Sequence, residues 1–285
     1  MTNLSIIVPH YNSIHTLKRL ISSIINEKKE DVEIIIVDDN SDCLDELRKL
    51  ESEYASHISL LTNYTKMNSA GTCRNIGIEN SKGMWLLFCD SDDYLIEGWY
   101  SVLSEFFDST SDVILFKPAS INEKSGLSTG REAPFIKLMD EYSKGIPGSE
   151  LRIKYNWISP CSRMIRRDLI IRDNIRFESV MYGNDVLFSV KLGHSISSFE
   201  LCDKPIYCIT QSEGSLTSTK NKCALRERSK VAARRFCYIK SILDSSEIKR
   251  INIRRKMLQH ILKSIKYGYF FEYLIYFHRI RKEKK

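Results

Sequence analysis

The sequence predicts an α/β protein built on a mostly parallel sheet that is flanked by helices. Through the first 117 residues, short apolar runs alternate with segments whose apolar residues recur at helical spacing. This alternation is typical of a parallel sheet covered on both faces. Acidic residues follow two of the apolar runs. Because ligands bind beyond the carboxyl ends of the strands in such sheets, these acidic residues mark the expected site.

Five apolar runs have the length and composition of buried strands. They cover residues 5–8, 34–37, 58–61, 84–88 and 113–116. Helical spacing of apolar residues is found at 17–25, 44–54, 71–80 and 186–192. From about 118 to 150, Ser, Gly, Pro and Lys replace this periodicity, which predicts a loop excursion. Beyond residue 223 we expect a mostly helical chain.

Charge divides the chain at about residue 220. Residues 220–285 carry 20 Lys and Arg against 5 Asp and Glu, whereas the preceding 219 residues carry 23 against 31. The basic C-terminal region is therefore expected to meet a polyanionic surface, either lipid or nucleic acid. The eight cysteines show no CxxC pair and no spacing suited to zinc. With no secretory signal visible, we expect reduced core thiols in a cytoplasmic protein.

The most informative stretch is the acidic one after the run 84–88. Asp90, Asp92 and Asp93 crowd together there, and a second pair, Asp38 and Asp39, follows the run 34–37. Clustered carboxylates repel one another and lose hydration, so a fold that keeps them needs compensation. A hard divalent cation with the phosphates it carries is the usual compensation. The two clusters predict one site for a metal and a nucleotide diphosphate.

Four segments at these strand ends and helix starts carry a family resemblance. They read SIIVPHYN at 5–12, IVDDNSD at 36–42, NSAGTCRN at 68–75 and DSDD at 90–93. In this order they resemble the glycosyltransferases commonly called family 2, which include enzymes of bacterial polysaccharide assembly. The resemblance is close over the first 117 residues and thins out towards residue 217. It implies a GT-A fold and a sugar-nucleotide donor, most often a UDP-sugar.

The resemblance also implies roles for individual residues. Pro9, Tyr11 and Asp39 would border the uracil and ribose, with Asn12 and Asn68 in the same donor site. Asp90 would face the ribose or the metal, and Asp92 would be the principal ligand of Mg²⁺ or Mn²⁺. Ser215, in a segment like the loop that closes over the donor in relatives, would contact a phosphate.

Three further residues near the donor have structural interpretations. Arg74, at a predicted helix start, would add positive charge to the phosphates or serve as a structural ion-pair partner. Asp42 is interpreted as the N-cap of the following helix, and Asp93 as a cap or as support for its neighbours.

An inverting reaction also needs a base that takes the proton of the acceptor hydroxyl. Relatives often carry Gly-Glu-Asp-x-x-Phe, and here residues 183–188 read GNDVLF. Asp185 is the candidate base, and Asn184 is a neutral neighbour that would orient donor or acceptor. Capping of the next helix is the competing role for Asp185. Trp157 falls where relatives place the acceptor floor and would stack on a sugar, although a core Trp fits equally.

The end of the chain interleaves aromatic and basic residues, at 263–282. This stretch is too short and too interrupted, by Gly268 and Glu272, to span a bilayer. Its composition suits the headgroup boundary of an anionic cytoplasmic leaflet. The alternative is a helix that packs its aromatics on the catalytic domain.

The sequence therefore predicts three parts: a nucleotide-sugar-binding half (1–117) and an acceptor-binding half (118–219) of one GT-A domain, and a basic, membrane-associating helical extension (220–285). The expected activity is inverting transfer of a hexose or N-acetylhexosamine (Glc, Gal, GlcNAc or GalNAc) from a UDP-sugar to a polyprenyl-diphosphate-linked glycan. A β linkage would form, in O-antigen or capsule assembly, at the inner face of the cytoplasmic membrane and without nucleic acid. A metal-dependent phosphoryl-transfer or nucleic-acid-processing enzyme and a non-catalytic nucleotide-sugar binder are the alternatives.

Overall fold

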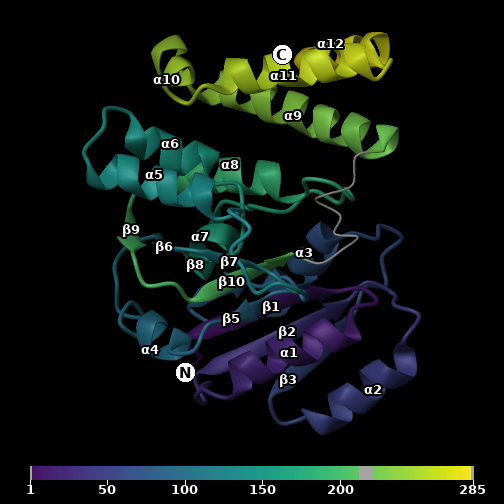
Figure 1. Cartoon of the computed structure of the whole chain (residues 1–285), viewed down its shortest axis with the longest axis vertical. Helices are drawn as coiled ribbons and strands as arrows, with labels where there is room; N and C mark the ends of the chain where they lie inside the picture. Colours follow the sequence, from purple (N-terminus) through teal and green to yellow (C-terminus); the bar gives the residue numbers. More distant parts are fainter. Residues whose placement is uncertain (1, 212–220, 284–285) are drawn as a thin grey trace.

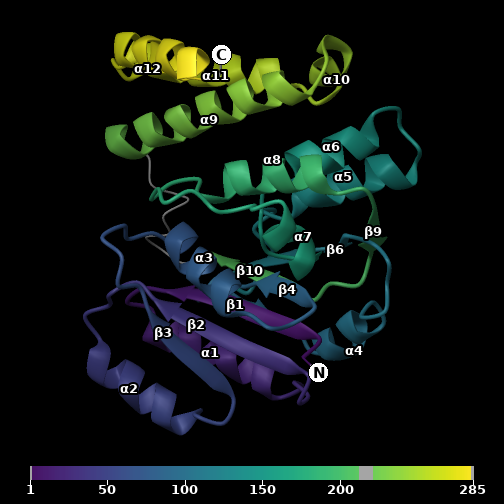
Figure 2. The same cartoon turned by 180° about the vertical axis from the view of Figure 1, so that it is seen from behind.

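The computed structural model describes residues 2–211 and 221–283, and these residues form stacked layers (Figure 1). From the bottom of Figure 1 upward come a helical layer, the central sheet, a second helical layer and the C-terminal helices. Figure 2 shows the same order from behind. The layers agree with the α/β class expected from the sequence.

A seven-stranded sheet lies at the centre, in the order β3-β2-β1-β4-β8-β6-β9. Its strands are β1 (Leu4–His10), β2 (Val32–Asp38), β3 (Ile58–Thr62), β4 (Trp85–Phe88), β6 (Val113–Phe116), β8 (Arg163–Arg166) and β9 (Phe199–Cys202). The first four pair in parallel, β8 runs antiparallel to β4 and β6, and β9 is parallel to β6. All five predicted strands are present in this sheet, and the antiparallel β8 and the edge strand β9 are the two that the alternation pattern missed.

A small second sheet ties the acidic stretch to the later part of the chain. It has the order β5-β10-β7, with bounds β5 (Tyr94–Leu95), β7 (Ala119–Asn122) and β10 (Tyr207–Gln211). Because β5 directly follows Asp93, its pairing with β10 brings residues 207–211 beside the predicted metal site.

Helices cover both faces of the large sheet. One face carries α1 (Ile14–Ile25), α2 (Leu44–Glu53) and α4 (Trp99–Ser104), and the other carries α3 (Ala70–Asn80), α5 (Ala133–Ser143), α6 (Ser149–Asn156), α7 (Arg167–Arg172) and α8 (Asp185–Ser195). Side chains of β1 alternate between these faces, as a pleated strand requires. A Cβ on Gly77 of α3 would lie 2.3 Å from Cγ2 of Ile7, so glycine permits this close approach of helix to strand.

The prediction of a loop excursion from 118 to 150 is wrong. This region contains β7, α5 and the first turn of α6. Only Leu138 and Met139 of α5 are buried, so the helix has too narrow an apolar face to produce a clear periodicity. Pro134 lies in the first turn of α5, where its missing N–H is not needed.

The C-terminal region is helical, as the sequence predicts. It consists of α9 (Lys222–Ile242), α10 (Ser245–Arg250), α11 (Ile253–Lys266) and α12 (Phe270–Glu283). Helix α9 packs against α8, and both α11 and α12 pack on α9. Tyr269 and Tyr273 are buried between these helices, so part of the aromatic content serves internal packing. Among the described helices, none combines the length and the hydropathy needed to cross a membrane.

Candidate active site

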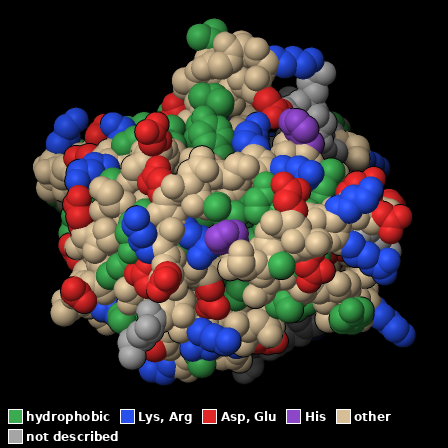
Figure 3. Space-filling view, turned by 90° about the horizontal axis from the view of Figure 1, so that it is seen from below, with side chains coloured by type: hydrophobic (Ala, Val, Ile, Leu, Met, Phe, Trp, Pro, Cys, Tyr) green, Lys and Arg blue, Asp and Glu red, His purple; other side chains and the backbone are tan. Residues whose placement is uncertain are grey.

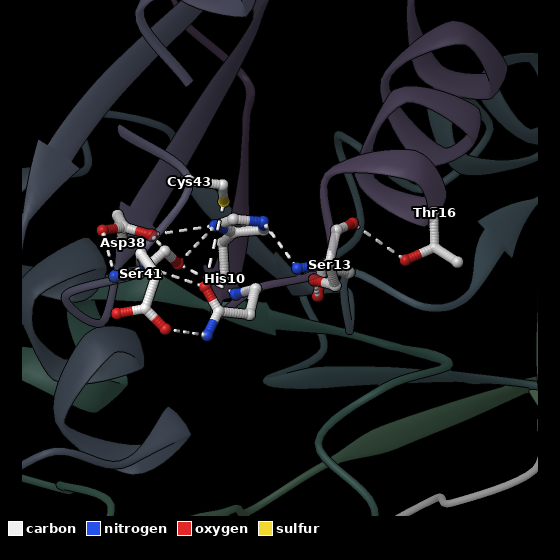
Figure 4. Close-up of polar contacts among 9 residues, drawn as sticks. His10, Ser13, Thr16, Asp38, Ser41 and Cys43 are labelled. Atoms are coloured by element: carbon white, nitrogen blue, oxygen red, sulfur yellow. Dashed lines mark hydrogen bonds and ion pairs between the residues drawn. The ribbon is translucent and has the colours of Figure 1, made fainter. Parts of the chain in front are cut away.

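A buried hydrogen-bond network joins the ends of β1 and β2 (Figure 4). His10 and Asp38 are paired in register, and His10 Nδ1 lies 2.9 Å from Asp38 Oδ1. The amide of Ser13 donates to His10 Nε2 at 3.2 Å, so Nδ1 carries the proton and donates to the carboxylate. Asp38 also accepts hydrogen bonds from the amide and hydroxyl of Ser41. Burial lowers the pKa of His10 and favours a neutral ring, so this pair has a structural role.

Asp39, the next residue, is held at the sheet edge by different contacts. Its amide donates to the carbonyl of His10 at 2.8 Å, and its Oδ1 accepts from Asn63 Nδ2 at 2.6 Å. Asn63 is completely buried and directly follows β3. Sequence reasoning missed Asn63. Its place after the third strand, equivalent to that of Asp39 after the second, is the signal that could identify it.

The other residues predicted to bind the donor nucleotide lie in the loops at the same edge. Pro9 is buried within β1, and Tyr11 is exposed directly after this strand. Asn12 has a φ of 47° and accepts a hydrogen bond at Oδ1 from the amide of Asp42 at 2.8 Å. Asn68 is exposed in the loop after β3. Because β1, β2 and β3 are parallel, these loops emerge together at one edge.

The interpretation of Asp42 as a helix cap is wrong. The N-cap of α2 is Cys43, and no side chain in the described structure caps this helix end. The Asp42 carboxylate instead accepts a hydrogen bond from Asn12 Nδ2 at 3.0 Å. The Asp42 side chain therefore connects the loops after β1 and β2 and does not cap α2.

Asp90, Asp92 and Asp93 come together after β4, with one carboxylate oxygen of each within 4.8 Å of the others. Asp93 is buried and accepts hydrogen bonds from the Tyr207 hydroxyl and, at 2.7 Å, from the Thr210 amide. These bonds agree with a supporting role.

Asp92 differs, since its carboxylate accepts a hydrogen bond from its own backbone amide and, among the described residues, no side chain donates to it. Burial, followed by the negative charge of Asp90, raises the pKa of Asp92 to about 6. The Asp90 side chain is 41% exposed and forms an ion pair with Arg74. Two carboxylates with oxygens left for a further ligand fit a divalent cation of the Mg²⁺ or Mn²⁺ type.

Two arginines that the sequence did not single out stand beside Asp92. Arg19, from α1, donates to the Asp92 carbonyl at 2.5 Å and forms an ion pair with Glu123. Arg131 donates to the carbonyl of Thr210 at 3.0 Å. Both guanidinium groups lower the pKa of Asp92 and partly oppose the effect of burial. They leave this edge suited to an anionic group such as a diphosphate.

Arg74 links the acidic stretch to the candidate base. This buried side chain donates to Asp90 and, at 2.8 Å, to Oδ1 of Asn184, and its guanidinium lies 5.2 Å from the ring centre of Phe177. The structural ion pair, one of the two roles considered for Arg74, is therefore present. The second hydrogen bond of Arg74 occupies the side-chain oxygen of Asn184.

Asp185 is the first residue of α8 and is half-buried. The N-cap position belongs to Asn184, and within the described chain no side chain makes a capping hydrogen bond at this helix start. Burial raises the pKa of Asp185 to about 6, and the charge of Arg74 opposes this shift. A carboxylate with a pKa close to neutrality is suited to accept a proton during catalysis.

The sequence matches the family model described as "Glycosyl transferase family 2" over residues 5–172. The chain belongs to this family. The matched residues include the sheet edge with the donor-site candidates and end before Asp185. The resemblance inferred from the four short segments is confirmed.

The curated relatives are bacterial proteins with glycosyltransferase names. The chain is 30% identical over 222 residues to "Poly(ribitol-phosphate) beta-N-acetylglucosaminyltransferase TarS" of Staphylococcus aureus, covering 75% of this chain and 36% of that protein. It is 26% identical to "Cholesterol galactosyltransferase" of Borreliella burgdorferi, covering 75% of this chain and 62% of that protein. The chain thus spans only about a third of the length of TarS.

Solved structures confirm the GT-A fold. Residues 1–349 of TarS in complex with UDP-GlcNAc superpose with a TM-score of 0.71 at 23% identity, covering 92% of this chain and 73% of that one. A mannosyltransferase of Pyrobaculum calidifontis, solved with GDP-Man and Mn²⁺, gives a TM-score of 0.61 at 12% identity, over 96% and 74% of the two chains.

The resemblance to family 2 also predicts contacts of Trp157 with the acceptor and of Ser215 with a phosphate. Trp157 is only 2% exposed, and its ring centre lies 5.0 Å from that of Phe135 in the core between the sheet and helices α5 to α8. A sugar cannot stack on a ring that is already covered, so the core interpretation of Trp157 holds. Ser215 lies outside the described residues.

Proposed function

We propose that this family 2 protein is an inverting glycosyltransferase that uses a UDP-sugar donor. The observation that carries the proposal is the hydrogen-bonded chain from Asp90 through Arg74 to Asn184, next to Asp185. It connects a carboxylate pair suited to a metal with a carboxylate suited to act as a base. A donor and an acceptor bound on the two sides of Arg74 would place leaving group and nucleophile at opposite ends of one site.

The donor end would hold the nucleotide through the loops after β1, β2 and β3. Asp39, fixed by Asn63, would accept hydrogen bonds from the uracil or ribose, with Pro9, Tyr11, Asn12 and Asn68 around it. Structures of the relative TarS in complex with UDP-GlcNAc and with UDP support a uridine nucleotide. The transferred group would be a hexose or N-acetylhexosamine.

Asp92 and Asp90 would hold Mg²⁺ or Mn²⁺, which when bound neutralises the diphosphate that departs. Arg19 and Arg131 face the same edge and would add fixed positive charge. Asp185 would take the proton of the acceptor hydroxyl as the oxygen attacks the anomeric carbon. Attack from the face opposite the leaving UDP inverts the configuration, so an α-linked donor would give a β linkage.

For the acceptor we propose a polyprenyl-diphosphate-linked glycan of O-antigen or capsule assembly, met at the inner face of the cytoplasmic membrane. The basic C-terminal region supports this placement, because it would bring the enzyme to an anionic leaflet. A non-catalytic nucleotide-sugar binder is the second candidate. It predicts UDP-sugar binding without turnover of any acceptor.

A thermal-shift screen of UDP-sugars with Mn²⁺ tests the donor proposal, because a ligand that binds only the folded state raises Tm. We expect one or a few UDP-sugars to raise Tm in the presence of Mn²⁺. The rise should be lost in Asp92→Asn and retained in Asp45→Asn, a control on exposed α2. Equal shifts with and without Mn²⁺, or an unaffected Asp92→Asn variant, would contradict the assignment of the metal.

A further inference from the structure

Helices α11 and α12 form the outermost layer of the protein, beyond α9 and on the far side from the sheet (Figures 1 and 2). Their inner sides bury Met257, Tyr273 and Ile280 in a cluster with α9. Their outer sides therefore face away from the rest of the protein and are free to meet another surface.

The outer sides carry apolar side chains that the fold does not cover. Leu258, Leu262 and Ile265 recur on α11 at intervals of four and three residues, which places them in one stripe along the helix. Helix α12 contributes Phe271, Leu274 and Ile275. These six side chains are between 41% and 78% exposed. We call this set the outer apolar stripe.

Basic residues surround the outer apolar stripe. Exposed cations of the two helices are Arg254, Arg255, Lys263, Lys266, Arg279, Arg281 and Lys282. Glu272 forms an ion pair with Arg226 of α9, so its charge is compensated within the protein. By contrast, the opposite face, seen from below in Figure 3, intersperses acidic and basic side chains. The outer side of α11 and α12 therefore combines exposed apolar side chains with an excess of positive charge.

We propose that the outer apolar stripe docks on an anionic phospholipid bilayer, with α11 and α12 lying in the plane of the headgroups. Apolar side chains framed by Lys and Arg match the boundary between headgroups and acyl chains, whereas a nucleic-acid backbone offers nothing for six exposed apolar groups. A second copy of the chain would bring a like-charged surface against this one. The surface refines the proposed action on a lipid-linked acceptor, because it names the face that meets the membrane.

Sedimentation of the full chain with vesicles tests this surface without donor, metal or acceptor, so its outcome is independent of the proposed activity. We expect binding to vesicles of phosphatidylcholine with phosphatidylglycerol that falls steeply as salt is raised, and little binding to phosphatidylcholine alone. Each basic residue near such a surface contributes about a five-fold change in affinity. Lys263→Gln/Lys266→Gln should therefore weaken binding by about 25-fold, whereas Lys49→Gln on α2 should not.

The apolar contribution has its own matched pair of variants. Leu262→Gln/Ile275→Gln should weaken vesicle binding at least ten-fold, whereas Leu127→Gln, at a leucine that is 70% exposed in a loop outside these helices, should leave it unchanged. Circular dichroism and melting curves verify that each variant is folded. Unchanged vesicle binding in both double variants would overturn the proposal. So would tighter binding to DNA or RNA than to anionic vesicles, or a dimer in solution that Leu262→Gln/Ile275→Gln dissociates.

Discussion

Replacing Asp185 with asparagine should abolish most activity and yet stabilise the protein in the absence of metal and nucleotide. Burial raises the pKa of Asp185 to about 6, from an ordinary value of 3.8 for an aspartate. A carboxyl group whose pKa is raised on folding stabilises the folded state below pH about 4, and this stabilisation is lost as pH rises through about 6. At pH 7.5 the charged group therefore costs about 3 kcal/mol, at about 1.4 kcal/mol per pKa unit.

The asparagine variant removes that penalty but also the favourable contact between a carboxylate and a helix N-terminus, about 0.3–1 kcal/mol. A net gain of about 2 kcal/mol at pH 7.5 would raise Tm by about 4 °C. At pH 4.5, where the native carboxyl group is mostly protonated, the gain should shrink towards zero. Because general-base catalysis contributes about 10²–10⁴-fold, turnover in the variant should fall by that factor.

Melting curves at the two pH values, together with UDP release, provide the measurement. Asp168→Asn is the matched control, because Asp168 is an exposed carboxylate in the first turn of α7. It should show neither the gain in Tm nor the loss of turnover. A lower Tm for Asp185→Asn at pH 7.5 with turnover retained would refute the reasoning and leave Asp185 with a structural role at the start of α8.

Two further variants test how the site is held. Asn63→Ala removes the donor to Asp39 and leaves a buried carboxylate oxygen unpaired, so we expect about 1–3 kcal/mol lower stability and weaker UDP binding, measured by denaturation and calorimetry. Glu178 forms an ion pair with Arg234 of α9, at 2.6 Å, in the segment that leads to Asp185. If this ion pair positions the segment that carries Asp185, Glu178→Gln should lower kcat several-fold with the donor KM unchanged. An equal change in both parameters would contradict that role.

The sequence predicts most of the fold because the central strands carry simple patterns. All seven residues of β1 are buried, and its centre, Ile6 to Val8, reads as a short apolar run. Strand β8 reads RMIR, and both of its arginines make contacts within the protein. Arg163 donates a hydrogen bond to Ser189, and the guanidinium carbon of Arg166 lies 4.2 Å from the ring centre of Trp85. A strand stabilised by such contacts resembles a polar surface segment in the sequence.

The candidate site could likewise be predicted from the sequence only in part. Carboxylates at strand ends are conspicuous, so Asp39, Asp90 and Asp92 could be named as candidates from their positions alone. The roles of Asn63 and Arg19 depend on contacts across more than 20 residues of sequence, to Asp39 and to the Asp92 carbonyl. Those contacts exist only after the strands have paired, and no local pattern reports them.

Manganese-dependent release of UDP from a UDP-sugar in the presence of an acceptor tests the central claim most directly. The account predicts turnover by the wild-type protein, loss of both donor binding and turnover in Asp92→Asn, and loss of turnover with donor binding retained in Asp185→Asn. Wild-type turnover in either variant, or turnover that is indifferent to removal of the divalent cation, would contradict it.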